Sequence, residues 1–264
     1  AGESGTATAN ALSCPSCGKS TPIGVLRRDR RDENGNTVYG LRQWGKSEFE
    51  PRPDDVFQER LYAVRYKHKY IENGKKKTKR YYRTPNEHDL ANEEKVRRIV
   101  AENIVKWQEQ GLVPSMAIER GDETERLLKE RGWTHWNHLF NARQLLVLSR
   151  FMERMREIRN PLLLAAGMTG IGRVADFDSR LCRWDSSRDE SKQAFYNQAL
   201  NTLSNWGVRS LAMLSTLWFR VPEQHQLCLD ARIITLDARS VSHNAHIWIT
   251  DPPYADAVNY HELS

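Results

Sequence analysis

The chain has 264 residues, of which 39% are hydrophobic and 28% are charged, a balance typical of a folded protein with a polar surface and not of a disordered one. Its formal net charge of +6 favours a polyanionic partner such as DNA. No apolar run approaches the roughly 20 residues that a membrane-spanning helix needs, and no signal peptide is evident. Four cysteines are too few for a disulfide scaffold at this length, so we expect a cytoplasmic protein with no membrane partner.

The first motif is a Cys-x-x-Cys-Gly turn near the amino end. Cys14 and Cys17 have the spacing of two thiolate ligands on a zinc knuckle, and Gly18 relaxes the tight loop between them. A structural zinc needs four ligands. We therefore expect half of a zinc ribbon whose partner pair lies outside this chain; the alternative is a metal-free turn with two free thiols. The residues that follow, up to about position 55, are expected to form irregular loops with short strands.

Residues 61–83 are predicted to form a β-hairpin. Tyrosines alternate along the first half, and the dipeptide Asn73-Gly74 favours a tight hairpin turn. Nine Lys or Arg residues lie between positions 65 and 83, against one acid, Glu72. A basic β-ribbon with tyrosines is a candidate contact for the DNA backbone; the alternative is a solvated hairpin whose lysines discourage edge pairing. The predicted DNA-binding residues are Lys75, Lys76, Lys77, Lys79 and Arg80.

The next stretch is expected to be mainly helical. A helix of about 20 residues should follow Asn86 and end near Gly111. A short helix should begin at Thr124 and stop at Gly132, and Asn141 should cap a third.

Three further features of this helical stretch bear on function or fold. His135 and His138 lie among aromatic residues, and we interpret them as packing histidines in preference to metal ligands. The glycines of residues 167–172 indicate a helix end, with a cofactor-binding glycine loop as the alternative. The apolar spacing from Phe195 to Trp206 predicts another helix.

Two apolar runs near the carboxyl end are predicted to be strands. Residues 247–249 form a buried strand that must stop at Asp251, because Pro252 and Pro253 have no amide hydrogen to donate. Residues 232–236 form the other run, and so short a link allows the two strands to lie side by side in one sheet. Ligands bind at the carboxyl ends of strands in open α/β sheets, where this arrangement would place Asp251.

The tetrapeptide Asp251-Pro252-Pro253-Tyr254 resembles the catalytic motif of S-adenosylmethionine-dependent methyltransferases that modify exocyclic amino groups of DNA bases. In that chemistry the Asp side chain and the following backbone carbonyl accept the two amine protons, and the Tyr ring stacks on an extruded base. The prolines hold these groups still before the reaction. The resemblance also implies that Asp237, at the end of the preceding run, lies by the adenine of the cofactor.

The order of features is similar to that of the adenine-specific DNA methylases that carry a zinc ribbon. Four stretches carry this resemblance: residues 14–19, residues 139–145, residues 180–184 with 197–200, and residues 237–238 ahead of 251–254. In that family the cofactor-binding glycine loop lies upstream of the ribbon. The resemblance therefore implies an internal fragment that lacks this loop and the second cysteine pair.

We therefore expect an α/β protein containing part of a Rossmann-like S-adenosylmethionine methyltransferase core. Its expected parts are a zinc-ribbon half with loops in residues 1–55, a basic β-hairpin in 56–88, a helical insertion in 89–225 and part of the catalytic core in 226–264. The implied function is methylation of an exocyclic amino group of DNA, at adenine N6, in restriction or phage defence with other subunits of such a system. The alternatives are a non-catalytic nucleic-acid-binding zinc-ribbon module, or a methyltransferase acting on RNA or on a protein amide.

Overall fold

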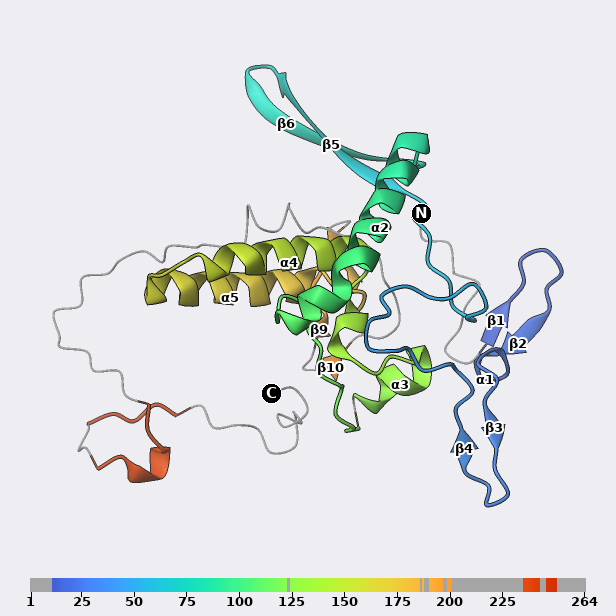
Figure 1. Ribbon diagram of the computed structural model, residues 1–264. Coiled ribbons are helices and arrows are strands. Elements are labelled where there is room, and N and C mark those ends of the chain that lie inside the picture. Colours follow the sequence, from blue (N-terminus) through green and yellow to red (C-terminus); the bar gives the residue numbers. More distant parts are fainter. Residues whose placement is uncertain are drawn as a thin grey trace.

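The computed structural model describes residues 11–122, 124–185, 187, 190–196, 199–200, 235–242 and 246–250. These residues form a mixed α/β structure of α-helices and two-stranded antiparallel sheets (Figure 1). The expected α/β composition is thus confirmed. No larger sheet forms among the residues described, so they do not contain the expected Rossmann-like sheet.

The amino-terminal part consists of short elements joined by turns, as the sequence predicts. These elements are β1 (Ala11–Ser13), β2 (Ser20–Pro22), α1 (Ile23–Leu26), β3 (Arg30–Arg31) and β4 (Thr37–Val38). β1 pairs with β2 and β3 with β4, both antiparallel. Asp32 closes the second of these hairpins, because its carboxylate accepts hydrogen bonds from the amides of Asn34 at 2.9 Å and Asn36 at 2.7 Å.

Helices follow the basic hairpin, which is formed by β5 (Val64–Glu72) and β6 (Lys75–Arg83). They are α2 (Glu87–Glu109), α3 (Glu125–Arg131), the 3-10 helix η1 (Trp136–Leu139), α4 (Ala142–Arg156) and α5 (Pro161–Phe177). The cap predicted at Asn141 is confirmed, and Asn86, which the predicted helix follows, is a cap as well; each closes a capping box. None of the helices described is long and apolar enough to cross a bilayer.

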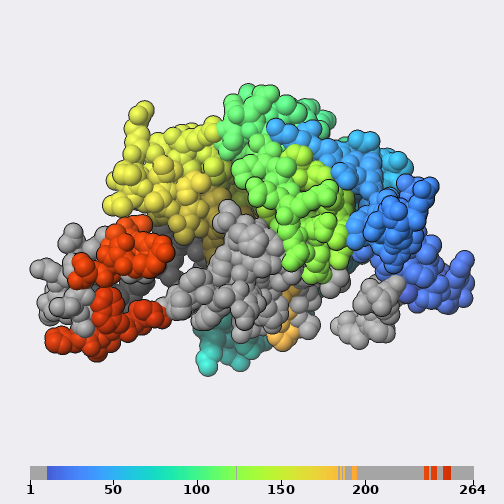
Figure 2. Space-filling view, turned by 90° about the horizontal axis from the view of Figure 1, so that it is seen from below, coloured from blue at the N-terminus to red at the C-terminus, as the bar shows by residue number. Residues whose placement is uncertain are grey.

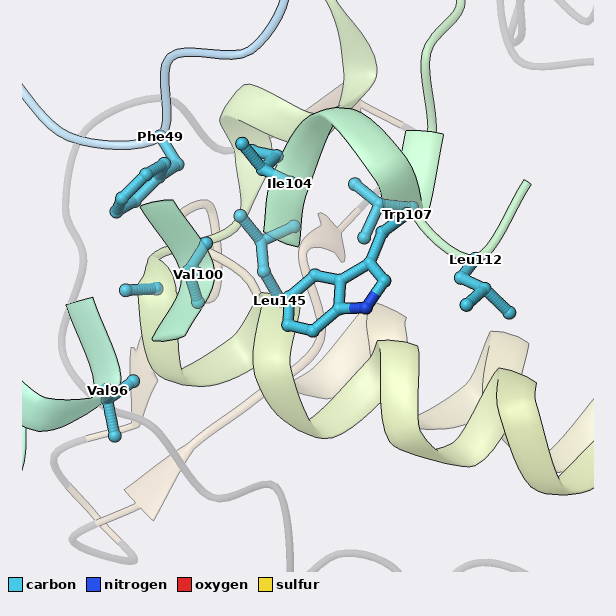
Figure 3. Packing of buried hydrophobic residues seen from close by; sticks show 9 residues of the cluster. Phe49, Val96, Val100, Ile104, Trp107, Leu112 and Leu145 are labelled. Atoms are coloured by element: carbon cyan, nitrogen blue, oxygen red, sulfur yellow. The ribbon is translucent and has the colours of Figure 1, made fainter. Parts of the chain in front are cut away.

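One hydrophobic cluster lies between α2 and α4 (Figure 3). Four of its nine buried residues come from one face of α2, at the spacing of three and four that a helix requires. Phe49 reaches this cluster from the amino-terminal loops, and α4 contributes Leu145. The buried residues are Phe49, Val96, Val100, Ile104, Trp107, Leu112, Val113, Ala142 and Leu145.

A second cluster joins the amino-terminal loops to the region around α3. Its buried members are Trp44, Leu127, Trp133, Leu139, Leu181 and Ala194. Figure 2 shows the amino-terminal residues in blue lying against the helical segments in green. His138 is fully buried beside this cluster, with its ring 5.4 Å from that of Trp44. The interpretation of His138 as a packing residue is thus confirmed.

The glycines of residues 167–172 occupy the middle of α5, so the predicted helix end is wrong and the alternative of a cofactor loop fails as well. Asn160 caps α5 and Pro161 is its first residue, so the helix is already formed before the first of these glycines. Gly167 serves packing, because a Cβ there would lie 2.3 Å from the sulfur of Met155 on α4, whereas a Cβ at Gly172 would meet nothing within 4 Å. Helices α4 and α5 lie side by side (Figure 1).

The helix predicted to begin at Phe195 is wrong in its first part. Residues Phe195–Tyr196 form β9, which pairs antiparallel with β10 (Ala199–Leu200). Just before them the amide of buried Ala194 donates to the carbonyl of Asp176 at 2.6 Å. This contact ties the chain to the end of α5 in an extended form. Another small hairpin precedes it, formed by β7 (Trp184–Asp185) and β8 (Glu190–Ser191). The remainder of the predicted helix lies outside the described residues.

The strand predicted at residues 247–249 is also wrong. Ile247, Trp248 and Ile249 are 78%, 57% and 92% exposed and take no part in a ladder. A buried strand needs neighbours that satisfy its amides and cover its side chains, and no strand of the described part lies beside these residues. Of the other predicted strand, Thr235 and Leu236 are described and are not in a strand. They precede the short 3-10 helix η2 (Ala238–Ser240).

Candidate nucleic-acid interface

The basic hairpin forms as the sequence predicts. β5 and β6 pair in an antiparallel register of nine residue pairs, from Val64 opposite Arg83 to Glu72 opposite Lys75. Asn73 and Gly74 form the turn with φ of 51° and 73°, the left-handed conformation that Asn and Gly adopt most readily. The ribbon extends away from the helices (Figure 1), and most side chains of β5 and β6 are exposed.

The register divides the side chains of the hairpin into two faces, because opposite residues in an antiparallel pair point to the same side. The cationic face, as we call it, carries Arg65, Lys67, Lys69, Lys76 and Arg80. On it, Lys67 lies directly opposite Arg80. Like charges in opposite positions destabilise a strand pair, and an anion bound between them would remove that cost.

The other face, the aromatic face, is already occupied by contacts within the hairpin. The rings of Tyr66 and Tyr81 stack with centroids 5.4 Å apart. The guanidinium of Arg83 lies over both rings, 5.7 Å and 5.2 Å from their centroids. Lys77 forms an ion pair with Glu72. Lys77 and Arg83 of this face are therefore engaged within the hairpin.

The five residues predicted to bind DNA do not lie together. Lys76 and Arg80 are on the cationic face, whereas Lys75, Lys77 and Lys79 are on the aromatic face. The prediction also omitted the three cations of β5 that complete the cationic face, which are Arg65, Lys67 and Lys69. Counting residues outward from the Asn-Gly turn in both directions gives this register, and it would have found them.

The zinc-knuckle turn forms between β1 and β2. The amide of Cys14 donates to the carbonyl of Lys19 at 2.8 Å, and that of Gly18 donates to the carbonyl of Cys14 at 2.9 Å. Gly18 has a φ of 71°, as the tight loop requires. Hydrogen bonds from Cys17 and Ser16 lower the pKa of the Cys14 thiol, which favours the thiolate form that binds metal.

These two thiols suit half of a tetrahedral zinc site. Within the described residues, no group of three His, Cys, Asp or Glu side chains is placed to hold a metal ion. Of the other cysteines, Cys182 is buried, and burial raises the pKa of its thiol to about 11. It is therefore unsuited to supply a thiolate. Zinc binding at Cys14 and Cys17 stays a prediction.

Asp237, the predicted cofactor contact, is exposed and pairs with a neighbour. Its carboxylate accepts hydrogen bonds from the side chain of Arg239, at 2.7 Å for the closest, and from the Arg239 amide at 2.9 Å. These hydrogen bonds lower the pKa of Asp237. Asp237 lines neither of the two cavities formed by the described residues around Arg131 and around Arg150.

The four residues of the predicted catalytic motif, Asp251, Pro252, Pro253 and Tyr254, lie outside the described residues. The chain is described up to Thr250, directly before them. Comparison with family models, with curated proteins and with solved structures gives no match to this chain. The hairpin, the knuckle and the sequence of the tetrapeptide are therefore the features on which a proposal of function rests.

Proposed function

We propose that this protein binds DNA through the cationic face of the β5–β6 hairpin and serves the methylation of an exocyclic amino group, adenine N6. The observation that carries the DNA contact is the gathering of five Lys and Arg side chains on one side of an exposed ribbon. A β-ribbon of this kind contacts phosphates without regard to sequence. The tetrapeptide of residues 251–254 carries the methylation.

The chemistry assigned to the tetrapeptide concerns the target amine. The lone pair of a base amine is delocalised into the ring, so the nitrogen is a poor nucleophile. The carboxylate of Asp251 and the carbonyl of Pro252 would accept hydrogen bonds from the two amine hydrogens and hold the lone pair out of the ring plane. Tyr254 would stack on the extruded base. S-adenosylmethionine supplies the methyl group in such reactions.

The DNA contact is tested by two matched variants, each with four cations replaced by glutamine. One changes the cationic face at Lys67, Lys69, Lys76 and Arg80; the control changes the aromatic face at Lys75, Lys77, Lys79 and Arg83. Each lost phosphate contact should reduce the slope of log K against log salt by about 0.9. We expect the first variant to lose about three to four units of slope in fluorescence anisotropy with duplex DNA.

The control variant should lose less than the cationic-face variant, because Lys77 and Arg83 are engaged within the hairpin. The two variants have the same net charge, so a general electrostatic effect would weaken both equally. If the salt slopes of DNA binding fell equally in the two variants, the two faces would not differ in DNA binding. If both slopes were the same as in wild type, these lysines would not contact phosphates and would serve only solubility.

Methylation is tested by Asp251→Ala and by Tyr254→Ala with Tyr254→Phe as its control. Asp251→Ala should abolish transfer of tritiated methyl groups to duplex DNA. Tyr254→Ala loses a stacking surface that contributes about 1–3 kcal/mol, whereas Tyr254→Phe keeps the ring and should keep much of the activity. Nucleoside analysis should give N6-methyladenine. Wild-type transfer by the Asp251→Ala protein would overturn the assignment.

The second candidate function is a nucleic-acid-binding module without catalysis. The exposure of residues 247–249 favours it, because the strand expected to hold the tetrapeptide in place does not form. In that case the cationic-face variant would lose DNA affinity as expected. No methyl transfer would occur in the wild type with DNA or RNA as substrate.

A further inference from the structure

A cavity of about 520 Å³ opens between the amino-terminal loops and the end of α3. It is lined by Arg28, by residues 40–42 and Trp44, by most of the loop of residues 51–62, and by Arg131, Trp133 and Arg180. Its volume falls in the range of pockets that enclose a small ligand. The loop that forms one wall leads directly into β5, since Tyr62 lies two residues before Val64.

Two of the arginines around the cavity are fully engaged in holding its walls. Arg180 is buried and pairs with Glu59 at 2.7 Å and 2.9 Å. Arg42 pairs with Asp55, at 2.8 Å and 2.6 Å, and with Glu48 at 2.6 Å. Their charges are compensated by these carboxylates. They fix the shape of the cavity and do not add to its net charge.

The remaining charged residues of the cavity leave it positive, because Arg28, Arg60 and Arg131 outnumber the one remaining acid, Asp54. Within the described part of the chain, no ion pair involves Arg28 or Arg60. Burial lowers the pKa of Arg131, and the nearby Arg27 lowers it further, although Glu130 opposes this. The charged form of Arg131 is therefore held in a site that disfavours it. An anion in the cavity would stabilise that charge.

Two aromatic rings lie beside these cations. Phe57 lines the cavity with the guanidinium of Arg131 over its ring, 5.4 Å from the centroid. Tyr62 lines it as well and is 60% exposed. An exposed aromatic ring next to arginines is the combination by which proteins hold single nucleotides, the ring stacking on the base and the cations meeting the phosphate.

We propose that this cavity binds one nucleotide of the DNA strand that the hairpin contacts. The base stacks on Tyr62, and the phosphate lies among Arg28, Arg60 and Arg131. The hairpin then contacts the phosphates of the DNA strand while the cavity holds one nucleotide of it. Both can act on one DNA strand because the loop that forms the cavity wall continues directly into β5. This proposal rests on the DNA binding proposed above and not on methylation.

The test is isothermal titration of the protein with deoxyadenosine monophosphate, with inorganic phosphate and deoxyadenosine titrated separately. Tyr62→Ala and Arg60→Gln change exposed residues, so both variants should fold, which circular dichroism verifies. Each should weaken binding of the nucleotide about fivefold or more. The control Tyr82→Ala removes an exposed tyrosine from the cationic side of the hairpin and should leave nucleotide affinity unchanged.

Several results would overturn the proposal. They are the absence of saturable nucleotide binding, equal affinity in all three variants, inorganic phosphate binding as tightly as the nucleotide, and tighter binding of S-adenosylmethionine at the same residues. A failure of the proposed DNA contact can be told apart from a failure of this proposal. In that case the cationic-face variant would bind duplex DNA as tightly as wild type, whereas Tyr62→Ala would still weaken nucleotide binding.

Discussion

The buried imidazole of His138 predicts a loss of stability in mild acid. Its Nδ1 lies 3.1 Å from the amide nitrogen of Thr134 and 3.3 Å from that of His135, and both amides can only donate. Nδ1 is therefore the acceptor, and Nε2 carries the hydrogen and donates to the carbonyl of Gly45 at 3.0 Å. A second proton would place an N–H against two other N–H groups. Burial lowers the pKa of His138 from its usual 6.5 to about 4, with the Gly45 carbonyl opposing the shift.

The sign and size of the effect follow from these values. Between pH 4 and 6.5 the unfolded chain binds a proton at His138 that the folded chain does not. The contribution of neutral His138 is therefore fully present above pH 6.5 and is lost as the pH falls towards 4. A difference of 2.5 pKa units corresponds to about 3.4 kcal/mol in total, of which about 2 kcal/mol would be gone at pH 5.

Urea unfolding followed by tryptophan fluorescence at about pH 8, 6.5 and 5 measures this loss. The variant His138→Gln lacks the titrating ring, so its free energy of unfolding should change much less over the same range. His135 contributes in the same direction, because burial lowers its pKa too. Burial works against the charged form of Glu59, but Arg180 holds its pKa below the usual range, so this acid acts at lower pH. An equal pH slope in wild type and His138→Gln would refute the reasoning.

Three further predictions concern metal, backbone and charge. A sample carrying Cys14→Ser and Cys17→Ser should hold less zinc by elemental analysis than wild type supplied with zinc; equal content would dismiss the half-site. Gly132→Ala should lower the melting temperature more than Gly74→Ala: both glycines have positive φ, but a Cβ at Gly132 would lie 2.1 Å from a backbone oxygen and one at Gly74 meets nothing within 4 Å. Arg180→Met should cost about 1–3 kcal/mol in chemical unfolding, since it leaves the carbonyls of Phe49, His138 and Phe140 without their buried donor; an unchanged free energy of unfolding would contradict the role given to this arginine.

Local signals in the sequence predicted the elements that depend on a few neighbouring residues. The cap at Asn141, the Asn73-Gly74 turn and the helix stop at Gly132 are each determined within four residues, and all three are confirmed. The alternation of side chains along the hairpin defines the cationic face as well. Composition alone points to the second strand, where the lysines are nearly contiguous, whereas the cations of β5 join the face only through the register.

The predictions that failed depended on partners distant in the sequence. The glycines of α5 are indistinguishable from a loop until Met155 of the neighbouring helix is placed against them. Residues 247–249 have the composition of a strand, but a strand exists only when another lies beside it. The cavity at Arg131 draws residues from the loops near position 28 to Arg180, and no spacing in the sequence indicates that these meet.

Arg180 has a consequence for the order in which the protein folds during its synthesis. Its guanidinium donates to the carbonyls of Phe49, 131 residues earlier, and His138, 42 residues earlier, as well as to Glu59, 121 residues earlier. During synthesis the loops that carry Phe49 and Glu59 leave the ribosome long before this arginine does. They must wait, with Trp44 among them, until Arg180 itself has emerged, because the side chain that binds them has not yet been translated.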